Sequence, residues 1–475
     1  MRRTLYVITV LLLAAALGSC SSSSSPSSGT SLVSITIGSD HAAKLSAERA
    51  TFFAKLRSFL RGRFGAGAAY AAIPSNVASV KVTVQASDMT TLTSTVDATG
   101  MSSVTVTFEV PNGRNREFIV SAFDASGNFA YWGRAFASLD GADVILPVTM
   151  VDLGSVNGTI WVSTSGSDAT GDGTEAKPYR TVTHALGATN SPTGILVEAG
   201  TYNAAGGEVY PLQLNAGTAL VCLGANHSTV LDDTGAAAVN AMITGAQNAR
   251  IDGCKVAVSL FSTVIDDGGT VLSVNNSYVQ APGSSFLTPT STGINLSSDS
   301  TVSNSTIYGI YDDGGGTGIR INSGNPTISQ CTITANAYGI SVAGGSPTIT
   351  GNTISGNGSY GVQMGGAVNA PTIAGNSFDH NGTGFYISVA GSSSIHNNKF
   401  FCNTSVDFYL VDPAAGGFDI TNNAWDHDSS TSVTGPTISS DLGGCPAGED
   451  ICYSYLLTTP PVLSPFLAAV PGGCM

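Results

Sequence analysis

Hydrophobic and polar residues follow one short pattern that recurs eight times between residues 251 and 425. The clearest copies, at residues 349–357 and 373–381, read Ile-x-x-Asn-x-hydrophobic-x-x-Asn. Successive copies begin 21 to 28 residues apart, and a period of this length is typical of a solenoid. Because each copy consists of short β-rich runs broken by Gly, Ser and Asn, the pattern predicts a parallel β-helix. The first residues of the copies are expected to point into the core: Ile251, Val274, Val302, Ile328, Ile349, Ile373, Ile395 and Ile420.

A small polar residue or a cysteine lies three positions after each of these inward residues. Side chains stacked in this way fit a tight turn and hydrogen-bond along a ladder from coil to coil. We therefore assign this column a structural role and not a role in an active site. Its members are Cys254, Ser277, Ser305, Cys331, Asn352, Asn376, Asn398 and Asn423.

A second short strand recurs in each coil, for example at residues 318–321 and 384–387. Alternation along a strand places its hydrophobic residues inside and the residue between them outside. Aromatic rings bind the C–H faces of sugars, and amide or guanidinium groups bind their hydroxyls, so this outward column is a candidate glycan-binding strip. The alternative is a solvated sheet face, on which tyrosine is common. The strip comprises Asn295, Arg320, Ser341, Gln363, Tyr386 and Tyr409.

Residues 32–152 contain short alternating strands at even intervals, separated by turn signals such as Asn112-Gly113. This spacing predicts a small immunoglobulin-like β-sandwich ahead of the solenoid. Residues 44–64 interrupt the strands with a helical period whose polar face is basic. Such a helix either packs its apolar face on the sandwich, which we favour, or lies on an anionic membrane surface.

The first 20 residues have the features of an export signal, with a basic start and an apolar run too short for a comfortable transmembrane helix. The ending Leu17-Gly-Ser-Cys20 resembles a bacterial lipobox, which implies cleavage before Cys20 and a lipid on its sulfur. Residues 21–31 then form a flexible Ser-rich tether. Since Ser21 is not the Asp that retains lipoproteins at the inner membrane, the resemblance implies an outer-membrane lipoprotein, on the extracellular face or in the periplasm. The alternative is an ordinary signal peptide with a chance cysteine.

The composition of the 475 residues, with 57 Gly and 11% charged residues, fits a turn-rich all-β protein. This length leaves room for two or three domains. The formal net charge is -14, and residues 154–475 contain only six Lys and Arg. Nucleic acid is therefore excluded as a partner, because its binding needs a basic face.

Residues 159–235 contain, in order, Trp-Val-Ser, Gly-Ser-Asp, Gly-Asp-Gly-Thr and Ile-Leu-Val-Glu-Ala-Gly-Thr-Tyr. This order resembles the domain of unknown function 1565, in the pectin-lyase-like superfamily of right-handed parallel β-helices. The resemblance implies that residues 159–235 cap the N-terminal end of the solenoid, with a helix at residues 181–186 over the open core. Coils are then expected at residues 236–430, and a Cys- and Pro-rich cap or tail at residues 431–475. The predicted fold class is all-β: a right-handed parallel β-helix preceded by a small immunoglobulin-like β-sandwich.

Asp168 and Asp172 fall in the Gly-rich turn of this resemblance. A functional interpretation makes them calcium ligands, whereas the plainer one has their carboxylates accept backbone N–H groups in Asx turns. We favour the Asx turns and expect no metal site and no cofactor, with calcium as the alternative.

Seven cysteines remain after Cys20, and export permits disulfides. Cys402, Cys445 and Cys452 are predicted to form a C-terminal staple, but the sequence does not determine the connectivity. The odd number leaves at least one thiol free, and no cysteine has metal-ligand spacing with histidine.

Catalytic residues are not assigned. Polysaccharide lyases of this superfamily use an Arg or Lys as the catalytic base, beside clustered Asp and calcium. The resemblance implies that Arg320 is the candidate for this base. The candidate acids are Asp266-Asp267 and Asp312-Asp313. Both pairs precede Gly-Gly, where an exposed turn is the plainer explanation.

Hydrolases of the superfamily use several convergent carboxylates, for which the candidates are Asp379-His380 and Asp426-His427. These pairs are two coils, or roughly 10 Å, apart. That separation is long for two catalytic carboxylates.

The expected function is that of a lipid-anchored cell-envelope protein, either a non-catalytic surface scaffold or a glycan-binding module. Its expected partners are a polysaccharide or envelope glycan, and the membrane through the N-terminal lipid. The alternative is a polysaccharide lyase or glycoside hydrolase that acts on extracellular polysaccharide.

Overall fold

The computed structural model describes residues 29–38, 73–86, 88–146, 148, 150–152, 158–189, 192–237, 240–258, 262–281, 291–310, 315–368, 370–388, 393–410, 420–425, 438–440 and 449–453. The predicted export signal with Cys20, the predicted helix at residues 44–64 and most of residues 431–475 lie outside this set. The chain divides into two compact units. The first comprises Met1–Ala122 and Trp132–Val151, and the second comprises Phe123–Tyr131 and Asp152–Met475.

The first unit is built from two small β-sheets. In one sheet β1 (Thr30–Gly38) pairs antiparallel with β4 (Ser103–Pro111) and parallel with β7 (Val144–Ile145). Alternate residues of β4 are buried, which gives the strand one core face and one outer face. This region confirms the small β-structure predicted ahead of the solenoid, while its immunoglobulin-like topology stays a prediction. The other sheet has the order β3 (Leu92–Asp97), β2 (Ser79–Gln85), β5 (Gly113–Phe123), β6 (Phe129–Leu139) and β8 (Met150–Asp152).

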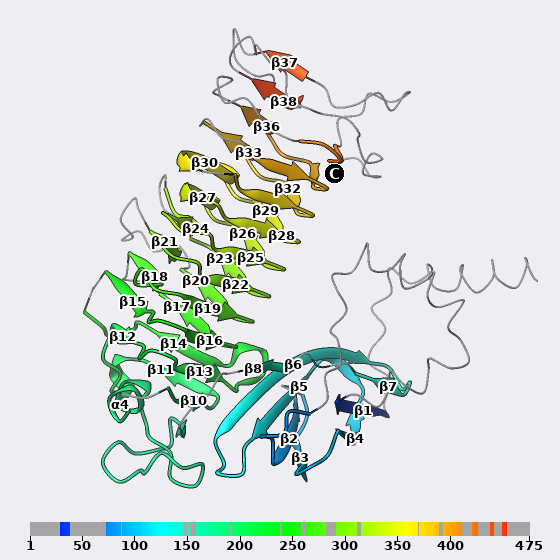
Figure 1. Cartoon of the computed structure of the whole chain (residues 1–475), viewed down its shortest axis with the longest axis vertical. Helices are drawn as coiled ribbons and strands as arrows, with labels where there is room; N and C mark the ends of the chain where they lie inside the picture. The colour runs from blue at the N-terminus through cyan, green and yellow to red at the C-terminus, as the bar shows by residue number, and fades with distance from the viewer. Residues whose placement is uncertain are drawn as a thin grey trace, which may run out of the picture. The chain divides into compact units, whose positions relative to one another are not determined.

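The second unit is a parallel β-helix whose coils build three long parallel sheets (Figure 1). The first sheet contains β9 (Thr159–Val162), β10 (Gly194–Val197), β13 (Ala219–Cys222), β16 (Ala249–Asp252), β19 (Leu272–Asn275), β22 (Thr301–Ser303), β25 (Thr327–Ser329), β28 (Thr348–Thr350), β31 (Thr372–Ala374) and β34 (Ser394–His396). The second sheet contains β11 (Gly200–Tyr202), β14 (Thr229–Asp232), β17 (Lys255–Ala257), β20 (Tyr278–Gln280), β23 (Thr306–Tyr308), β26 (Thr332–Thr334), β29 (Thr353–Ser355), β32 (Ser377–Asp379) and β35 (Lys399–Phe401). The third sheet contains β12 (Leu212–Gln213), β15 (Ala241–Thr244), β18 (Thr263–Asp266), β21 (Thr292–Leu296), β24 (Thr317–Ile321), β27 (Tyr338–Gly345), β30 (Tyr360–Val368), β33 (Thr383–Ile387), β36 (Val406–Leu410), β38 (Glu449–Tyr453) and β37 (Ile438–Ser440).

The predicted inward column lies in the first sheet and forms one continuous line of register partners. Ile251 pairs with Val274, and the line continues through Ile328 and Ile373 to Ile395. Each of these side chains is at most 1% exposed, as is Ile420 in the last described coil. Their burial removes apolar surface from water along the whole axis, which is the main stabilising contribution of a solenoid.

The predicted polar ladder is also present, and its asparagines are buried. Asn376 accepts the backbone and side-chain N–H groups of Asn352, both at 2.9 Å. Its own amide donates to Ile349 O at 2.8 Å and to Asn398 Oδ1 at 3.0 Å. Each asparagine therefore satisfies backbone groups at a corner where strand pairing is interrupted.

A second asparagine ladder runs parallel to the first and was not predicted. It consists of the final asparagine of four of the eight copies of the sequence pattern, and its members are at most 3% exposed. The ladder ends where Asn403 donates to the buried carboxylate of Asp407 at 2.6 Å. Its members are Asn336, Asn357, Asn381 and Asn403.

Cys222 and Cys254 form a disulfide between adjacent coils, with their Cα atoms 4.9 Å apart. The sequence did not predict this pair. Cys331 is a buried free thiol, and burial raises its pKa to about 11. Cys402 is disulfide-bonded, which agrees with its predicted part in a staple, but Cys445 lies outside the described residues.

The N-terminal end of the solenoid is covered by α4 (Val182–Gly187), close to where the sequence predicts a helix. Val182, Ala185 and Leu186 of this helix pack into the solenoid core. Two 3₁₀ turns, η1 (Ala204–Gly206) and η2 (Ala225–His227), lie in the following coils. Within the described part of the chain, no helix has the length and apolarity that a membrane crossing requires.

Asp172 makes the Asx-turn contact that the plainer alternative predicts, whereas Asp168 accepts backbone N–H groups 12 and 13 residues further along the chain. Asp168 Oδ1 accepts the backbone N–H groups of Arg180 and Thr181 at 2.8 and 3.1 Å. Asp172 Oδ1 accepts the backbone N–H and the hydroxyl of Thr174. The Thr174 hydroxyl holds the pKa of Asp172 below its ordinary value. Both carboxylates therefore hold the turn beside the cap.

Candidate ligand-binding face

The six residues of the predicted strip lie in one column of the third sheet. Asn295 pairs with Arg320, and the register continues through Ser341 and Gln363 to Tyr386 and Tyr409. All six are partly exposed, whereas the hydrophobic residues that flank them in each strand are buried. The predicted geometry of the column is therefore present, from β21 to β36. Its role in binding is not decided by this geometry.

Four tyrosines from consecutive coils form an aromatic row on the outer face of this sheet. The ring centroids of Tyr338 and Tyr360 are 5.7 Å apart, and those of Tyr360 and Tyr386 are 4.6 Å apart and stacked. Tyr409 meets Tyr386 edge-on at 5.4 Å. These spacings lie in the range of favourable aromatic pairs. We call Tyr338, Tyr360, Tyr386 and Tyr409 the tyrosine row.

Sequence alternation missed half of the tyrosine row. Tyr360 precedes Gly361, and strict alternation places it on the same inward face as Val362. Gly361 lies at a corner where a Cβ atom would come within 2.5 Å of Gly384 O in the next coil. Tyr360 is instead partly exposed, with its ring beside Tyr386. The repeated Tyr-Gly pair, also present at Tyr338, was the available signal.

The tyrosine rings shield one another from solvent. Burial raises the pKa of Tyr360, and the neighbouring rings of Tyr386 and Tyr338 raise it further. The Tyr360 phenol therefore stays neutral at physiological pH, as a donor and acceptor of hydrogen bonds. A neutral aromatic surface with hydroxyl groups at its edges suits an uncharged, hydroxyl-rich ligand.

Arg320 provides the positive charge next to the tyrosine row. It lies one coil before Tyr338, in register with Ser341, and it is the only Lys or Arg in the described strands of the third sheet. Its Nε atom is buried without a hydrogen-bond partner among the described residues. A guanidinium group in this position can donate hydrogen bonds to a ligand on the sheet.

The predicted acidic partners of Arg320 do not form a catalytic cluster within the described residues. Asp267 is fully buried and not at an exposed turn as expected, because its carboxylate accepts the backbone N–H groups of Ser297 and Ser298. Asp266 accepts from Gly268 N and from the Asn295 amide. The pair therefore anchors a turn. Asp312 and Asp313 lie outside the described residues.

Asp379 and His380 lie at the end of β32 on the second sheet, away from the strip, and hydrogen-bond to each other. Their ligand atoms and the Cys402 sulfur lie within 4.8 Å of one another. Cys402 is in a disulfide, so its sulfur is not available as a thiolate ligand for a metal. Asp426 and His427 lie outside the described residues.

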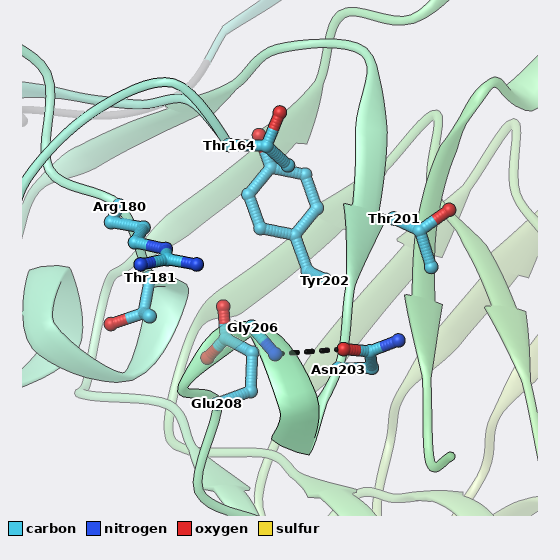
Figure 2. Close-up of a pocket in the computed structure, with 8 residues that line it drawn as sticks. All are labelled: Thr164, Arg180, Thr181, Thr201, Tyr202, Asn203, Gly206 and Glu208. Atoms are coloured by element: carbon cyan, nitrogen blue, oxygen red, sulfur yellow. Dashed lines mark hydrogen bonds between the residues drawn. The ribbon is translucent and has the colours of Figure 1, made fainter.

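A small cavity of about 110 Å³ lies beside α4 (Figure 2). Its most buried charged group, Glu208, accepts the backbone N–H groups of Val182 and Thr183 at 2.6 and 2.9 Å. Burial raises the pKa of Glu208. This carboxylate therefore caps the helix, and the cavity belongs to the cap of the solenoid. The lining residues are Thr164, Arg180, Thr181, Thr201, Tyr202, Asn203, Gly206 and Glu208.

Comparison with known proteins bears on the fold. The model of a family described as right-handed beta helix region matches residues 225–368 and 292–444. With the three parallel sheets, this match identifies the solenoid as a right-handed β-helix, as predicted. No curated protein matches the chain.

Several solved structures are similar to this chain at low identity. Pectate lyase Pel9A is 15% identical, with a TM-score of 0.37, over 66% of this chain and 79% of that one. A rhamnogalacturonan lyase is 12% identical, with a TM-score of 0.28, over 66% and 86%. The catalytic domain of a GH87 alpha-1,3-glucanase in complex with nigerose is 12% identical, with a TM-score of 0.28, over 85% and 90%.

Proposed function

We propose that this chain is a lipid-anchored cell-envelope protein whose β-helix holds a glycan on the outer face of the third sheet without cleaving it. The observation that carries the proposal is the tyrosine row. Four partly exposed rings follow one another at 4.6 to 5.7 Å on a sheet that also presents Ser341 and Gln363. Sugar rings stack their C–H faces on such rings and direct their hydroxyls to the neighbouring polar groups.

Rigidity favours binding on this face. Each tyrosine belongs to a strand that is paired on both sides, and the asparagine ladders fix the corners between strands. The side chains therefore lose little further freedom when a ligand binds. An extended glycan that runs along the solenoid axis would meet one ring in each coil, about every 4.8 Å.

The non-catalytic part of the proposal rests on the surroundings of Arg320. Among the described residues no acid forms an ion pair with Arg320, and Asp266 and Asp267 are engaged in their own turn. A β-helix fold does not by itself imply an activity. The second candidate function is a polysaccharide lyase or glycoside hydrolase, and the partly exposed Arg320 on the outer face of the third sheet is the observation that favours it.

One experiment separates the two candidates. The full chain is passed through native gels that contain alginate, xylan, laminarin or dextran, and each polysaccharide is afterwards assayed for new unsaturated or reducing ends. Retention without products, reduced in Tyr386→Ala and unchanged in the exposed control Thr353→Ala, supports the glycan-binding proposal. Products that disappear in Arg320→Ala would replace it with the enzyme, and no retention on any gel would overturn it.

A further inference from the structure

A second aromatic cluster lies on the second sheet, at a different face of the coils from the tyrosine row. The rings of Tyr278 and Tyr308 have centroids 6.3 Å apart, and His227 lies 6.1 Å from Tyr278 on the other side. Lys255 Nζ lies 5.6 Å from the centroid of the Tyr278 ring. Together with Gln280, which pairs in register with Tyr308, these residues form what we call the second-sheet patch.

The second-sheet patch is open to solvent and rigidly held. Tyr308 is 40% exposed on a strand that is paired on both sides. Tyr278 lies in the middle of a line of register partners, between Lys255 and Thr306. His227 is fixed by a 2.9 Å contact between its Nε2 atom and Asn276 O. The surface therefore has a fixed shape before any ligand binds.

The two faces repeat one chemical arrangement. On the second sheet a cation, Lys255, is followed by a tyrosine in each of the next two coils. On the third sheet Arg320 is likewise followed by Tyr338 and Tyr360 in the next two coils. An amide side chain accompanies the rings on both faces. The same chemistry favours the same class of ligand at both places, which is a hydroxyl-rich sugar chain with hydrogen-bond acceptors for the cation.

Charge also limits what the second-sheet patch can hold. The chain has a net charge of -14, and Lys255 is one of six Lys and Arg between residue 154 and the C-terminus. A positively charged partner would repel the Lys255 ammonium. A purely apolar partner would bury the ammonium without hydrogen-bond acceptors. A sugar chain offers oxygen atoms to the ammonium and C–H faces to the rings.

We propose that the second-sheet patch is a second glycan-binding site, so that one molecule holds two glycan chains on two different faces. This inference rests on the proposed function, because it assigns the same ligand class to both faces. Its consequence is that the protein links separate polysaccharide chains, and that its attachment to a polysaccharide surface gains from bivalency.

The number of binding sites per chain tests this inference. The probe is a fluorescent oligosaccharide of whichever of alginate, xylan, laminarin or dextran retains the protein, and equilibrium dialysis against the full chain counts the molecules bound. We expect two per chain in the wild type and one in Lys255→Ala/Tyr308→Ala. Tyr386→Ala should weaken the other site alone. Tyr308→Phe, which keeps the ring, and the exposed control Thr332→Ala should both bind two.

Each result has one meaning. If the wild type binds one oligosaccharide and Tyr386→Ala removes it, the second site does not exist and the proposed function stands. If Lys255→Ala/Tyr308→Ala still binds two, the patch has been assigned wrongly. If no polysaccharide retains the wild type, the proposed function and this inference fall together. Circular dichroism of each variant confirms that the β-helix is folded.

Discussion

Tyr360 and Tyr386 stack across adjacent coils with ring centroids 4.6 Å apart and an interplanar angle of 28°, although they are not register partners. Tyr360 pairs with Thr383, and Tyr386 pairs with Gln363. Thr383 lies three positions before Tyr386, so the two side chains lean toward each other along the strands. This contact joins the first two rings of the row to the last two, and it makes a continuous platform from four separate residues.

The first prediction concerns the centre of this platform. Tyr386 contacts both Tyr360 and Tyr409, so Tyr386→Ala should interrupt the row and weaken glycan binding by about 1–2 kcal/mol, or roughly 5- to 30-fold. Tyr386→Phe keeps the ring and should lose much less. Retention in polysaccharide gels at several concentrations measures the affinity. Equal losses in the two variants would mean that the hydroxyl, and not the ring, makes the contact.

The second prediction is a pH dependence of stability. Burial beside neighbouring rings raises the pKa of Tyr360 above its ordinary value of 10.0. The folded state therefore keeps the phenol proton at a pH where the unfolded chain has released it. This contribution to stability is complete below about pH 10 and is lost as the pH rises through the higher pKa of the folded state.

Urea unfolding at increasing pH measures this effect. The unfolding midpoint of the wild type should fall more steeply above about pH 10 than that of Tyr360→Phe, which has no phenol to titrate. At pH 8 the pH dependence of the two proteins should be the same. Identical slopes above pH 10 would show that Tyr360 titrates normally.

The repeat made the solenoid predictable because its period is local. The inward column from Ile251 to Ile395 and the outward strip from Asn295 to Tyr409 both follow from alternation within short strands. One residue pattern per coil then sets the register of all coils. The polar ladder through Asn376 follows for the same reason, since every coil turns at the same position.

Features that depend on contacts between coils were not predictable in the same way. Gly361 breaks the alternation because its backbone approaches the next coil, and this turns Tyr360 outward. Cys222 precedes the recognised repeats, so its pairing with Cys254 depends on a coil register that the sequence does not display. Asp267 precedes Gly-Gly in the sequence, which predicts an exposed turn. In the structure, serines from the following coil donate to its carboxylate and bury it.

The third prediction concerns the ladder. Asn376→Ala removes the acceptor of two N–H groups of Asn352 and the donor to Ile349 O, all of them buried. We expect a loss of about 3 kcal/mol in the free energy of unfolding, because buried groups are left without partners. Urea unfolding measures it, with the exposed control Thr353→Ala expected near wild type. A loss below about 1 kcal/mol would mean that water replaces the missing amide.

The fourth prediction concerns the disulfide of the N-terminal coils. Cys222 and Cys254 are separated by 32 residues, and a crosslink over this loop stabilises a fold by about 3–4 kcal/mol in the chain-entropy model. The Cys222→Ala/Cys254→Ala variant should therefore unfold at lower temperature than the wild type under oxidising conditions. Peptide mapping by mass spectrometry should recover the two cysteines in one crosslinked fragment. Recovery of either cysteine alkylated would contradict the pairing.

The last prediction tests the anchor in the proposed function. The proposed function has a lipid on the Cys20 sulfur of the lipobox-like ending at residues 17–20, so cells fed an alkyne-labelled fatty acid should incorporate the label into the chain. Cys20→Ala should lose the label, and because the proposed lipid is then absent, the chain should move to the soluble fraction. Cys331→Ala, which removes a buried thiol of the solenoid, serves as the matched control and should keep both label and membrane fraction. Retention of the label in Cys20→Ala would mean that the lipid is attached to another residue. A wild-type chain without label would remove the lipid anchor from the proposed function, and glycan binding by the tyrosine row would then be tested separately.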